Sequence, residues 1–291
     1  MTSMGFSQAA EPFIHQYSQS TASNYLMALH SLNRYFGGEP ALEDLTPGLM
    51  KDYERWLHAQ GVCDNTSSCY IRSLRSLFNK ICERWELEMH NPFRHVFTGV
   101  KATKKRSLSV REIMRLHNLD LPEGSQLAFA RDLFLFSVYA CGMPFVDLAY
   151  LSTDKTDDKY IVYYRHKTDN PVEVRIEPCM RDIIDRWHEP SSPFLFPILY
   201  YKGRQFGYRK RLSNYNTALH QLRQLAGIRS QLSSYCARHS WATLAFEQKG
   251  DLNVISKGLG HSDTRVTRIY IRDHAERRLF TLNKKVIARI S

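Results

Sequence analysis

The sequence predicts a mainly α-helical protein that has two domains and one small β-hairpin. Three observations support this prediction. The chain has 291 residues, which is enough for about two domains. Apolar residues recur at helical spacing along much of the sequence. Two short runs of β-branched and aromatic residues, 160–165 and 172–176, flank a turn and indicate the hairpin.

Residues 1–97 predict a small helical domain. Capping residues precede apolar residues at helical spacing in the segment 20–36. Thr46 followed by Pro47 indicates a second helix, because proline suits the first helical position. A third helix is expected to begin near Asn65, with its apolar side chains facing the domain core.

Residues 98–107 predict a linker between the domains. Four of the six residues at 101–106 are basic, namely Lys101, Lys104, Lys105 and Arg106. This composition is typical of a solvated spacer. It suits equally well a strap that contacts phosphate groups, so the sequence leaves both interpretations open.

Residues 108–291 predict a second, larger domain. Ser109 and Glu112 match a capping box and mark the start of its first helix. The apolar segment Leu127–Met143 is expected to form a central helix. After the hairpin, further helices are expected from Pro178, near Arg204, at Ser233 and around Asp251.

The charge of the chain is uneven. The formal net charge is +11, made up of −2 in residues 1–100 and +13 in residues 101–291. A positive excess of this size favours a polyanionic partner. A basic surface that serves only solubility is the alternative.

Several classes of protein are excluded by composition. The longest nearly apolar run, 133–146, is shorter than the roughly 20 residues that span a bilayer. The first residues lack the basic start and apolar core of a secretory signal. The six cysteines form no CxxC pair and have no histidines at zinc-ligand spacing. We therefore expect a soluble cytoplasmic protein without membrane partner, disulfides, metal or cofactor.

Most of the chemical information lies in three segments. SSYCARHSWAT occupies 233–243, GLGHS occupies 258–262, and Tyr270 follows His261 by nine positions. A tyrosine can attack a phosphodiester and form a covalent phosphotyrosyl ester. Arginine and other donors can stabilise the negative charge that the transition state gains. Together these segments resemble the tyrosine recombinase, or phage integrase, family, and around SYxARHSWAT they look similar to recombinases of the Bacteroides group.

The resemblance implies a role for individual residues. Tyr270 matches the family nucleophile, and Arg238 matches the second catalytic arginine. His261 matches the family position that steadies the scissile phosphate. Lys167, in RHKT after the first hairpin strand, matches the lysine proposed to protonate the leaving 5′ oxygen.

The resemblance also implies the architecture and the partner. It implies a SAM-like core-binding domain, an integrase-type catalytic domain with a tail helix, and double-stranded DNA held between them. A homotetramer would assemble on paired recombination sites, with a monomer or weak oligomer in the absence of DNA. The amphipathic tail, 279–290, could dock on a neighbouring subunit or on its own domain.

The sequence departs from the family motif at two positions. Pro144 occupies the position of the first catalytic arginine, and proline has neither charge nor donor. Arg131 and Arg165 are our candidates for a substitute. Tyr235 stands where a histidine is usual; its phenol can donate a hydrogen bond but is a poor base near neutral pH.

A second basic cluster and two alternative functions complete the sequence-based picture. Arg204, Arg209, Lys210 and Arg211 lie within KGRQFGYRKR, which is either a solvated loop or a phosphate-contacting surface.

Loss of the first arginine would suit a DNA-binding regulatory protein that has lost catalysis. A type IB topoisomerase, which uses the same covalent chemistry, is the other alternative.

Overall fold

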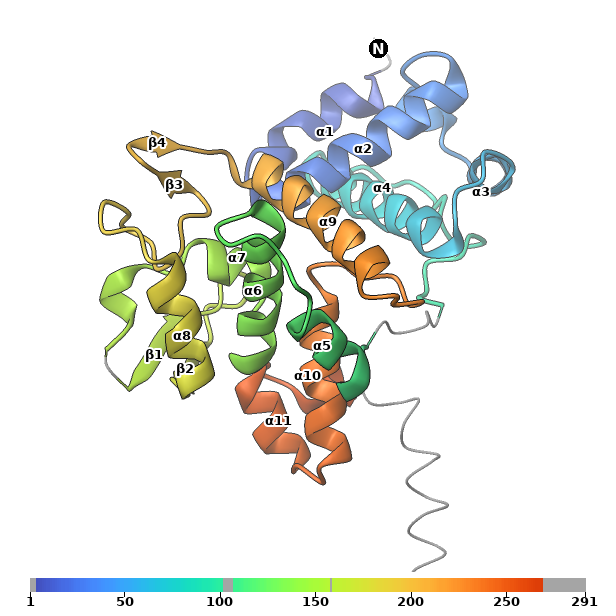
Figure 1. Ribbon diagram of the computed structural model, residues 1–291. Coiled ribbons are helices and arrows are strands. Elements are labelled where there is room, and N and C mark those ends of the chain that lie inside the picture. The colour runs from blue at the N-terminus through green and yellow to red at the C-terminus, as the bar shows by residue number, and fades with distance from the viewer. Residues whose placement is uncertain (1–3, 102–106, 158, 269–291) are drawn as a thin grey trace, which may run out of the picture. The chain divides into compact units, whose positions relative to one another are not determined.

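The computed structural model describes residues 4–101, 107–157 and 159–268 (Figure 1). The chain forms two compact units, Met1–Thr103 and Lys104–Ser291. Among the described residues, no helix is long and apolar enough to cross a membrane.

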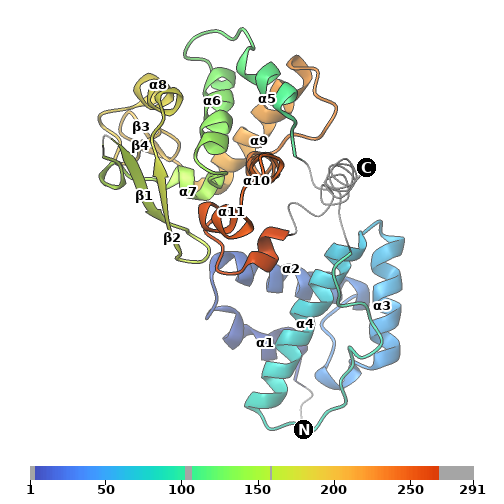
Figure 2. The ribbon, with the colours of Figure 1, turned by 90° about the horizontal axis from the view of Figure 1, so that it is seen from below.

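The first unit is helical. Its helices are α1 (Phe6–Ile14), α2 (Gln19–Phe36), α3 (Pro47–Ala59) and α4 (Asp64–Arg84), with a 3-10 turn, η1, at Leu42–Asp44. The other three helices pack against α4, which is the longest of them (Figure 2). Buried side chains of α4 at helical spacing form the centre of this unit, namely Ile71, Leu74, Phe78 and Ile81.

Local sequence signals explain where these helices begin. The Thr46 hydroxyl accepts a hydrogen bond from the Leu49 amide at 3.3 Å, and Pro47 is the first residue of α3. This confirms the start predicted from the Thr-Pro pair, because the cap satisfies one of the unpaired amides of the first turn.

The second unit is built around one buried helix, α6 (Gln126–Tyr139). Its other helices are α5 (Val110–His117), α7 (Phe145–Ala149), α8 (Pro178–Trp187), α9 (Tyr208–Leu225), α10 (Cys236–Glu247) and α11 (Leu252–Gly258), with a 3-10 turn, η2, at Thr153–Lys155. Helix α6 packs against α5, α8, α9 and α10 (Figure 1). The predicted capping box is present, since Ser109 and Glu112 each accept a hydrogen bond from the other's backbone amide.

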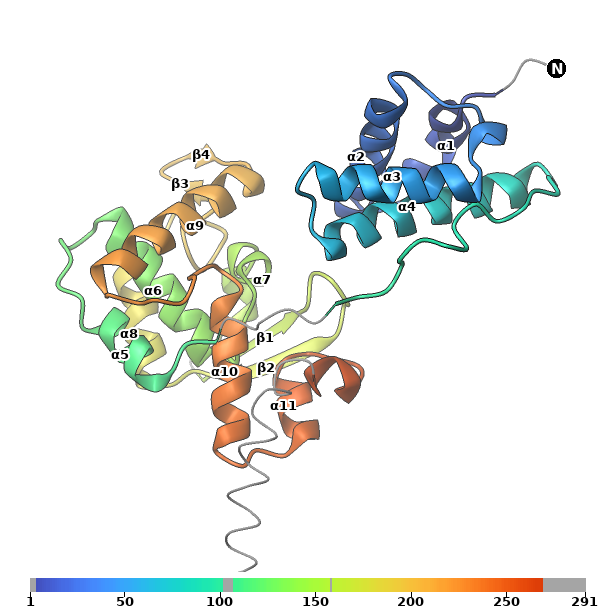
Figure 3. The same ribbon diagram turned by 90° about the vertical axis from the view of Figure 1, so that its right-hand side faces the viewer.

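The predicted hairpin is confirmed. Strands β1 (Tyr160–Tyr164) and β2 (Pro171–Arg175) are antiparallel, with Val162 opposite Glu173. Alternate side chains of both strands are buried, as the period of two requires. Helix α11 packs beside β2, so the hairpin and the segment after α11 come together (Figure 3).

The helix expected near Arg204 was wrongly placed. A second small hairpin, β3 (Tyr200–Tyr201) paired with β4 (Arg204–Gln205), occupies this position, and α9 begins only at Tyr208. Lys202 and Gly203 form its turn with positive φ angles, so this segment reverses direction instead of continuing as a helix.

Helix α6 ends earlier than the apolar pattern predicts. Cys141 and Gly142 have φ angles of 56° and 72°, in the left-handed region, so the helix ends at Tyr139 and the chain turns into α7. A Cβ atom added to Gly142 would lie 2.8 Å from the Cα atom of Arg238. Glycine at this position therefore lets the α6–α7 turn pack directly on α10.

A buried carboxylate joins α6 to α8. Asp132 is 2 % exposed, and its oxygens accept hydrogen bonds from Arg131 Nε at 2.9 Å, Arg186 Nη1 at 2.7 Å and Trp187 Nε1 at 2.8 Å. These three donors compensate the carboxylate for the water that it loses on burial.

We predict that Asp132→Ala lowers the free energy of unfolding by about 3 kcal/mol, because it leaves a partly buried arginine and an indole without their acceptor. Urea unfolding followed by circular dichroism measures the change. Asp185→Ala, on the exposed side of α8, is the matched control and should have little effect. Equal destabilisation by both variants would contradict this prediction.

Candidate active site

The guanidinium of Arg238 is the centre of the site. Arg238 lies in the first turn of α10 and is 2 % exposed. Its Nη1 donates to the Gly142 carbonyl at 3.1 Å, and its Nη2 donates to the Leu259 carbonyl. The same Nη2 lies 2.9 Å from His261 Nε2. One side chain thus contacts the α6–α7 turn and the LGH segment.

Arg165 reaches the same place from the hairpin. It follows β1, is 7 % exposed, and its Nη1 also donates to the Leu259 carbonyl. Its Nε lies 2.7 Å from Oδ2 of Asp147, whose side chain is fully buried. Two guanidinium groups therefore share one backbone oxygen, with one carboxylate beside them.

Gly260 allows this close packing. Its φ angle is 63°, and an added Cβ atom would lie 2.8 Å from Arg165 Cγ and 2.7 Å from Val172 Cγ2. The Asn170 side chain donates to the Gly260 carbonyl at 3.1 Å. A residue without a side chain is needed here for the LGH segment to pack against the hairpin.

His261 is held as a neutral imidazole. Its Nδ1 lies 2.9 Å from the Thr267 hydroxyl, and its Nε2 faces Arg238. Arginine can only donate, so Nε2 accepts and we assign the ring proton to Nδ1. Burial, followed by the charges of Arg238, Arg165 and Lys167, lowers the pKa of His261 to about 4.

Lys167 lies at the edge of this cluster. It is exposed in the turn between β1 and β2, close enough to contribute to the lowered pKa of His261. Asp147 Oδ1 accepts a hydrogen bond from the His166 amide at 2.8 Å. The carboxylate that binds Arg165 therefore also holds the turn that presents Lys167.

Comparison with family models assigns both parts of the chain. Residues 107–277 match the phage integrase family, and residues 6–95 match the phage integrase SAM-like domain. The chain belongs to the phage integrase family. Both the resemblance and the fold class predicted from the sequence are thereby confirmed.

Relatives and solved structures agree with this membership. The tyrosine recombinase XerC of Alcanivorax borkumensis is 24 % identical over 259 residues, covering 87 % of this chain and 83 % of that protein. A lambda integrase dimer bound to a COC′ core site has the same fold, with a TM-score of 0.72 and 14 % identity over 92 % of this chain and 95 % of that chain. A lambda integrase tetramer bound to a Holliday junction also gives 0.72, with 14 % identity over 93 % and 78 % of the two chains.

Tyr235 lies near Arg238 in this member of the phage integrase family. It precedes α10 directly and is 50 % exposed, and its ring packs edge-on against His239 at 4.9 Å between centroids. It stands three positions before Arg238, a spacing that brings side chains together on a helix. Its side chain therefore lies on the same part of α10 as Arg238.

The structure separates the two candidates for the missing arginine. Pro144 directly precedes α7 and follows the turn that contacts Arg238. Arg131 donates to Asp132 and to the Leu119 carbonyl instead, and the helix rises by roughly 12 Å between residue 131 and its end. Only Arg165 shares an acceptor with Arg238.

Not every predicted site residue is described. Tyr270 and the tail lie outside the described residues, as do Lys104, Lys105 and Arg106. Among the described residues, no group of three or more histidine, cysteine, aspartate or glutamate side chains could hold a metal ion.

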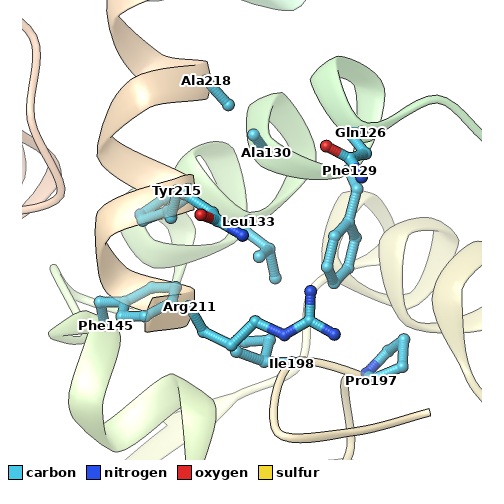
Figure 4. A pocket seen from close by; sticks show the side chains of 11 residues that line it. Gln126, Phe129, Ala130, Leu133, Phe145, Pro197, Ile198, Arg211, Tyr215 and Ala218 are labelled. Carbon is cyan, nitrogen blue, oxygen red and sulfur yellow. The ribbon is translucent and has the colours of Figure 1, made fainter. Parts of the chain in front are cut away.

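The residues that the sequence predicts to contact the DNA backbone fall into two groups where the structure describes them. Lys101, Arg204, Arg209 and Lys210 are exposed, and Lys101 pairs with Asp64 at 2.9 Å. Arg211 differs from its neighbours on α9, because it shares the inward helix face of Tyr215 and Ala218. Figure 4 shows its guanidinium pointing into a cavity of about 90 Å³ beside Phe129 and Ile198.

Sequence reasoning missed Asp147. It is the only charged residue between Asp132 and Asp154, inside a long apolar segment. A lone charge in such a segment indicates a buried, paired group, and this signal could have identified it. The Leu259 carbonyl left no signal, because any residue type supplies a backbone oxygen.

We predict that His261 titrates with a pKa of about 4, and therefore stays neutral at pH 7. Because the unfolded chain binds this proton near pH 6.5, His261 stabilises the fold above that pH, and the contribution is lost as the pH falls towards 4. Nitrogen-15 NMR titration, with His261→Gln to assign the signal, measures the pKa. A midpoint near 6.5 would contradict this description of the site.

Proposed function

We propose that this protein is a site-specific recombinase that cleaves and rejoins double-stranded DNA through a covalent 3′-phosphotyrosyl intermediate. The main support is the arrangement around Leu259, where two buried guanidinium groups meet beside a neutral histidine and an exposed lysine. Such preorganised donors suit a phosphoryl group that gains negative charge during transfer.

In the proposed reaction, the Tyr270 hydroxyl releases its proton to solvent as its oxygen attacks the scissile phosphorus. A bond forms between the tyrosine oxygen and phosphorus, and the bond to the 5′ oxygen breaks. Lys167 gives a proton to that leaving oxygen. The 5′-hydroxyl of a partner strand then attacks the phosphotyrosyl ester and releases the tyrosine, so the number of phosphodiester bonds is conserved without an external energy source.

The remaining residues stabilise the phosphate in this scheme. Arg238 donates to its non-bridging oxygens. His261 orients Arg238, because its Nε2 contacts Arg238 Nη2. Tyr235 adds a phenolic donor close to Arg238.

Exposed basic residues would hold the DNA backbone. They are Lys101, Arg204, Arg209 and Lys210, together with Lys104, Lys105 and Arg106 from the predicted linker. Because lambda integrase forms a tetramer on a Holliday junction, we propose that four copies of this chain act on two paired sites. We place the protein in the cytoplasm, where its DNA substrate lies.

A nicked suicide substrate tests the nucleophile, using a duplex that the protein selects from random-sequence DNA. We predict that the wild-type chain forms a denaturant-stable protein–DNA adduct and that Tyr270→Phe forms none, since phenylalanine lacks the attacking oxygen. Tyr160→Phe, which changes a tyrosine at the start of β1, is the matched control and should form the adduct like the wild type.

Three other results would contradict part or all of this proposal. Equal adduct from wild type and Tyr270→Phe would exclude Tyr270 as the nucleophile. DNA binding without any adduct would favour a regulatory DNA-binding protein. Relaxation of plasmids that lack a selected site would favour a type IB topoisomerase.

Salt dependence tests the backbone contacts. We predict that the logarithm of the binding constant falls steeply with the logarithm of salt concentration, and that Lys210→Ala reduces this slope by about 0.9. Fluorescence anisotropy with a selected duplex measures both slopes. Lys155→Ala, whose amino group lies 3.5 Å from Asp154, is the control and should leave the slope unchanged. A flat salt response of the wild type would contradict the proposed contacts.

A further inference from the structure

One catalytic charge is missing from the motif of this chain. The family motif has an arginine where this chain has Pro144, which can neither donate nor carry charge. The proposed reaction adds negative charge to a phosphate that is already an anion. Removal of one well-placed donor from such a site typically lowers the rate by about 10²–10³.

A second guanidinium nevertheless lies beside Arg238. Arg165 Nη1 and Arg238 Nη2 both donate to the Leu259 carbonyl, so these two nitrogens are no more than about 5 Å apart. The oxygens of a single phosphate could therefore contact both groups. Arg165 comes from the hairpin and not from the α6–α7 turn, so the charge enters the site from a different element.

Asp147 determines where Arg165 lies. Its side chain is fully buried, and its Oδ2 lies 2.7 Å from Arg165 Nε. Its Oδ1 accepts from the His166 amide at 2.8 Å, which fixes the next residue of the hairpin turn as well. The ion pair holds the guanidinium beside Asp147, and the hydrogen bond from Nη1 to the Leu259 carbonyl sets its direction, because the donors of arginine have a fixed geometry.

Donor groups and charge remain for a ligand. One Nη1 hydrogen of Arg165 is used by the Leu259 carbonyl, Nε faces Asp147 as an ion pair, and among the described residues nothing accepts from its Nη2. Arg238, Arg165 and Lys167 are cationic, Asp147 is the only carboxylate paired with them among the described residues, and His261 is neutral. The described cluster therefore has a net positive charge that suits a phosphate.

We propose that Arg165 is a catalytic residue that replaces the missing first arginine, and that Asp147 is the residue that positions it. Arg165 donates to a non-bridging oxygen of the scissile phosphate together with Arg238. This inference rests on the proposed recombinase function and adds to it the source of the second guanidinium.

Arg131 provides a matched control for Arg165. Both arginines lie beside a buried aspartate, with Nε–Oδ distances of 2.9 Å for Arg131 and 2.7 Å for Arg165. Arg131 donates to the Leu119 carbonyl and to Asp132, and no hydrogen bond joins it to the site residues that the structure describes. A general effect of breaking a buried ion pair should therefore appear in both variants, whereas a catalytic effect should appear only in Arg165→Ala.

The first experiment compares initial rates of adduct formation on a nicked, selected duplex. We expect Arg165→Ala to form the adduct about 10²–10³ times more slowly than the wild type, and Arg131→Ala to form it at the wild-type rate. Circular dichroism and DNA binding confirm that each variant is folded. A wild-type rate for folded Arg165→Ala would overturn the inference and leave the proposed function intact. Absence of adduct from the wild type would overturn both.

The second experiment separates a catalytic role from a structural one. A methylphosphonate at the scissile position replaces one charged oxygen with a methyl group and so removes the negative charge that Arg165 would stabilise. We expect the deficit of Arg165→Ala to shrink to no more than about tenfold on this neutral substrate, with each diastereomer measured separately. The same deficit on both substrates would show a structural role, because misfolding affects both equally.

The third experiment tests Asp147 with a double-mutant cycle. Asp147→Asn keeps the shape of the side chain but loses its charge, and we expect it to slow adduct formation in the wild-type background. The same change should have little further effect in Arg165→Ala, because a positioning residue acts only through the group that it positions. Fully multiplicative effects of the two changes would show that Asp147 does not act through Arg165.

Discussion

The site in the second unit depends on one backbone oxygen that accepts hydrogen bonds from two buried arginines. The Leu259 carbonyl binds both Arg238 and Arg165, which belong to elements far apart in the sequence. Two glycines with positive φ angles make the meeting possible. Gly142 lets the α6–α7 turn contact α10, and Gly260 lets the LGH segment contact the hairpin.

Two neighbouring guanidinium groups repel each other, and the fold has to compensate for this repulsion. Asp147 supplies one negative charge, while the Leu259 and Gly142 carbonyls supply dipoles. Burial, together with the positive charge that remains, keeps His261 neutral, so it adds no further cation to the cluster. Donors that are already fixed in the folded protein need no reorganisation when a phosphate gains charge, and this is the physical advantage of such a site.

The sequence predicts the regular parts of this structure well. Thr46 with Pro47, and Ser109 with Glu112, act locally through caps, so their helices could be placed without knowledge of the fold. The hairpin followed from its β-branched and aromatic runs, and the spacing from Arg238 to His261 identified the family. These signals depend on neighbours in sequence.

The features that sequence reasoning missed or left open depend on tertiary contacts. Nothing local distinguishes Arg165 from Arg131, because only the folded chain shows which aspartate each one meets. Arg211 resembles the exposed residues beside it, although its helix face turns its guanidinium inward. Helix α6 ended early because two residues adopt left-handed φ angles, which apolar periodicity does not reveal.

A crystal structure of the protein with its selected duplex and orthovanadate, which mimics pentacoordinate phosphorus, would test the central claim most directly. Vanadium should be bonded to the Tyr270 oxygen, with its equatorial oxygens about 3 Å from nitrogens of both Arg238 and Arg165. A vanadate bound by Arg238 alone, with Arg165 still confined to Asp147 and Leu259, would contradict it.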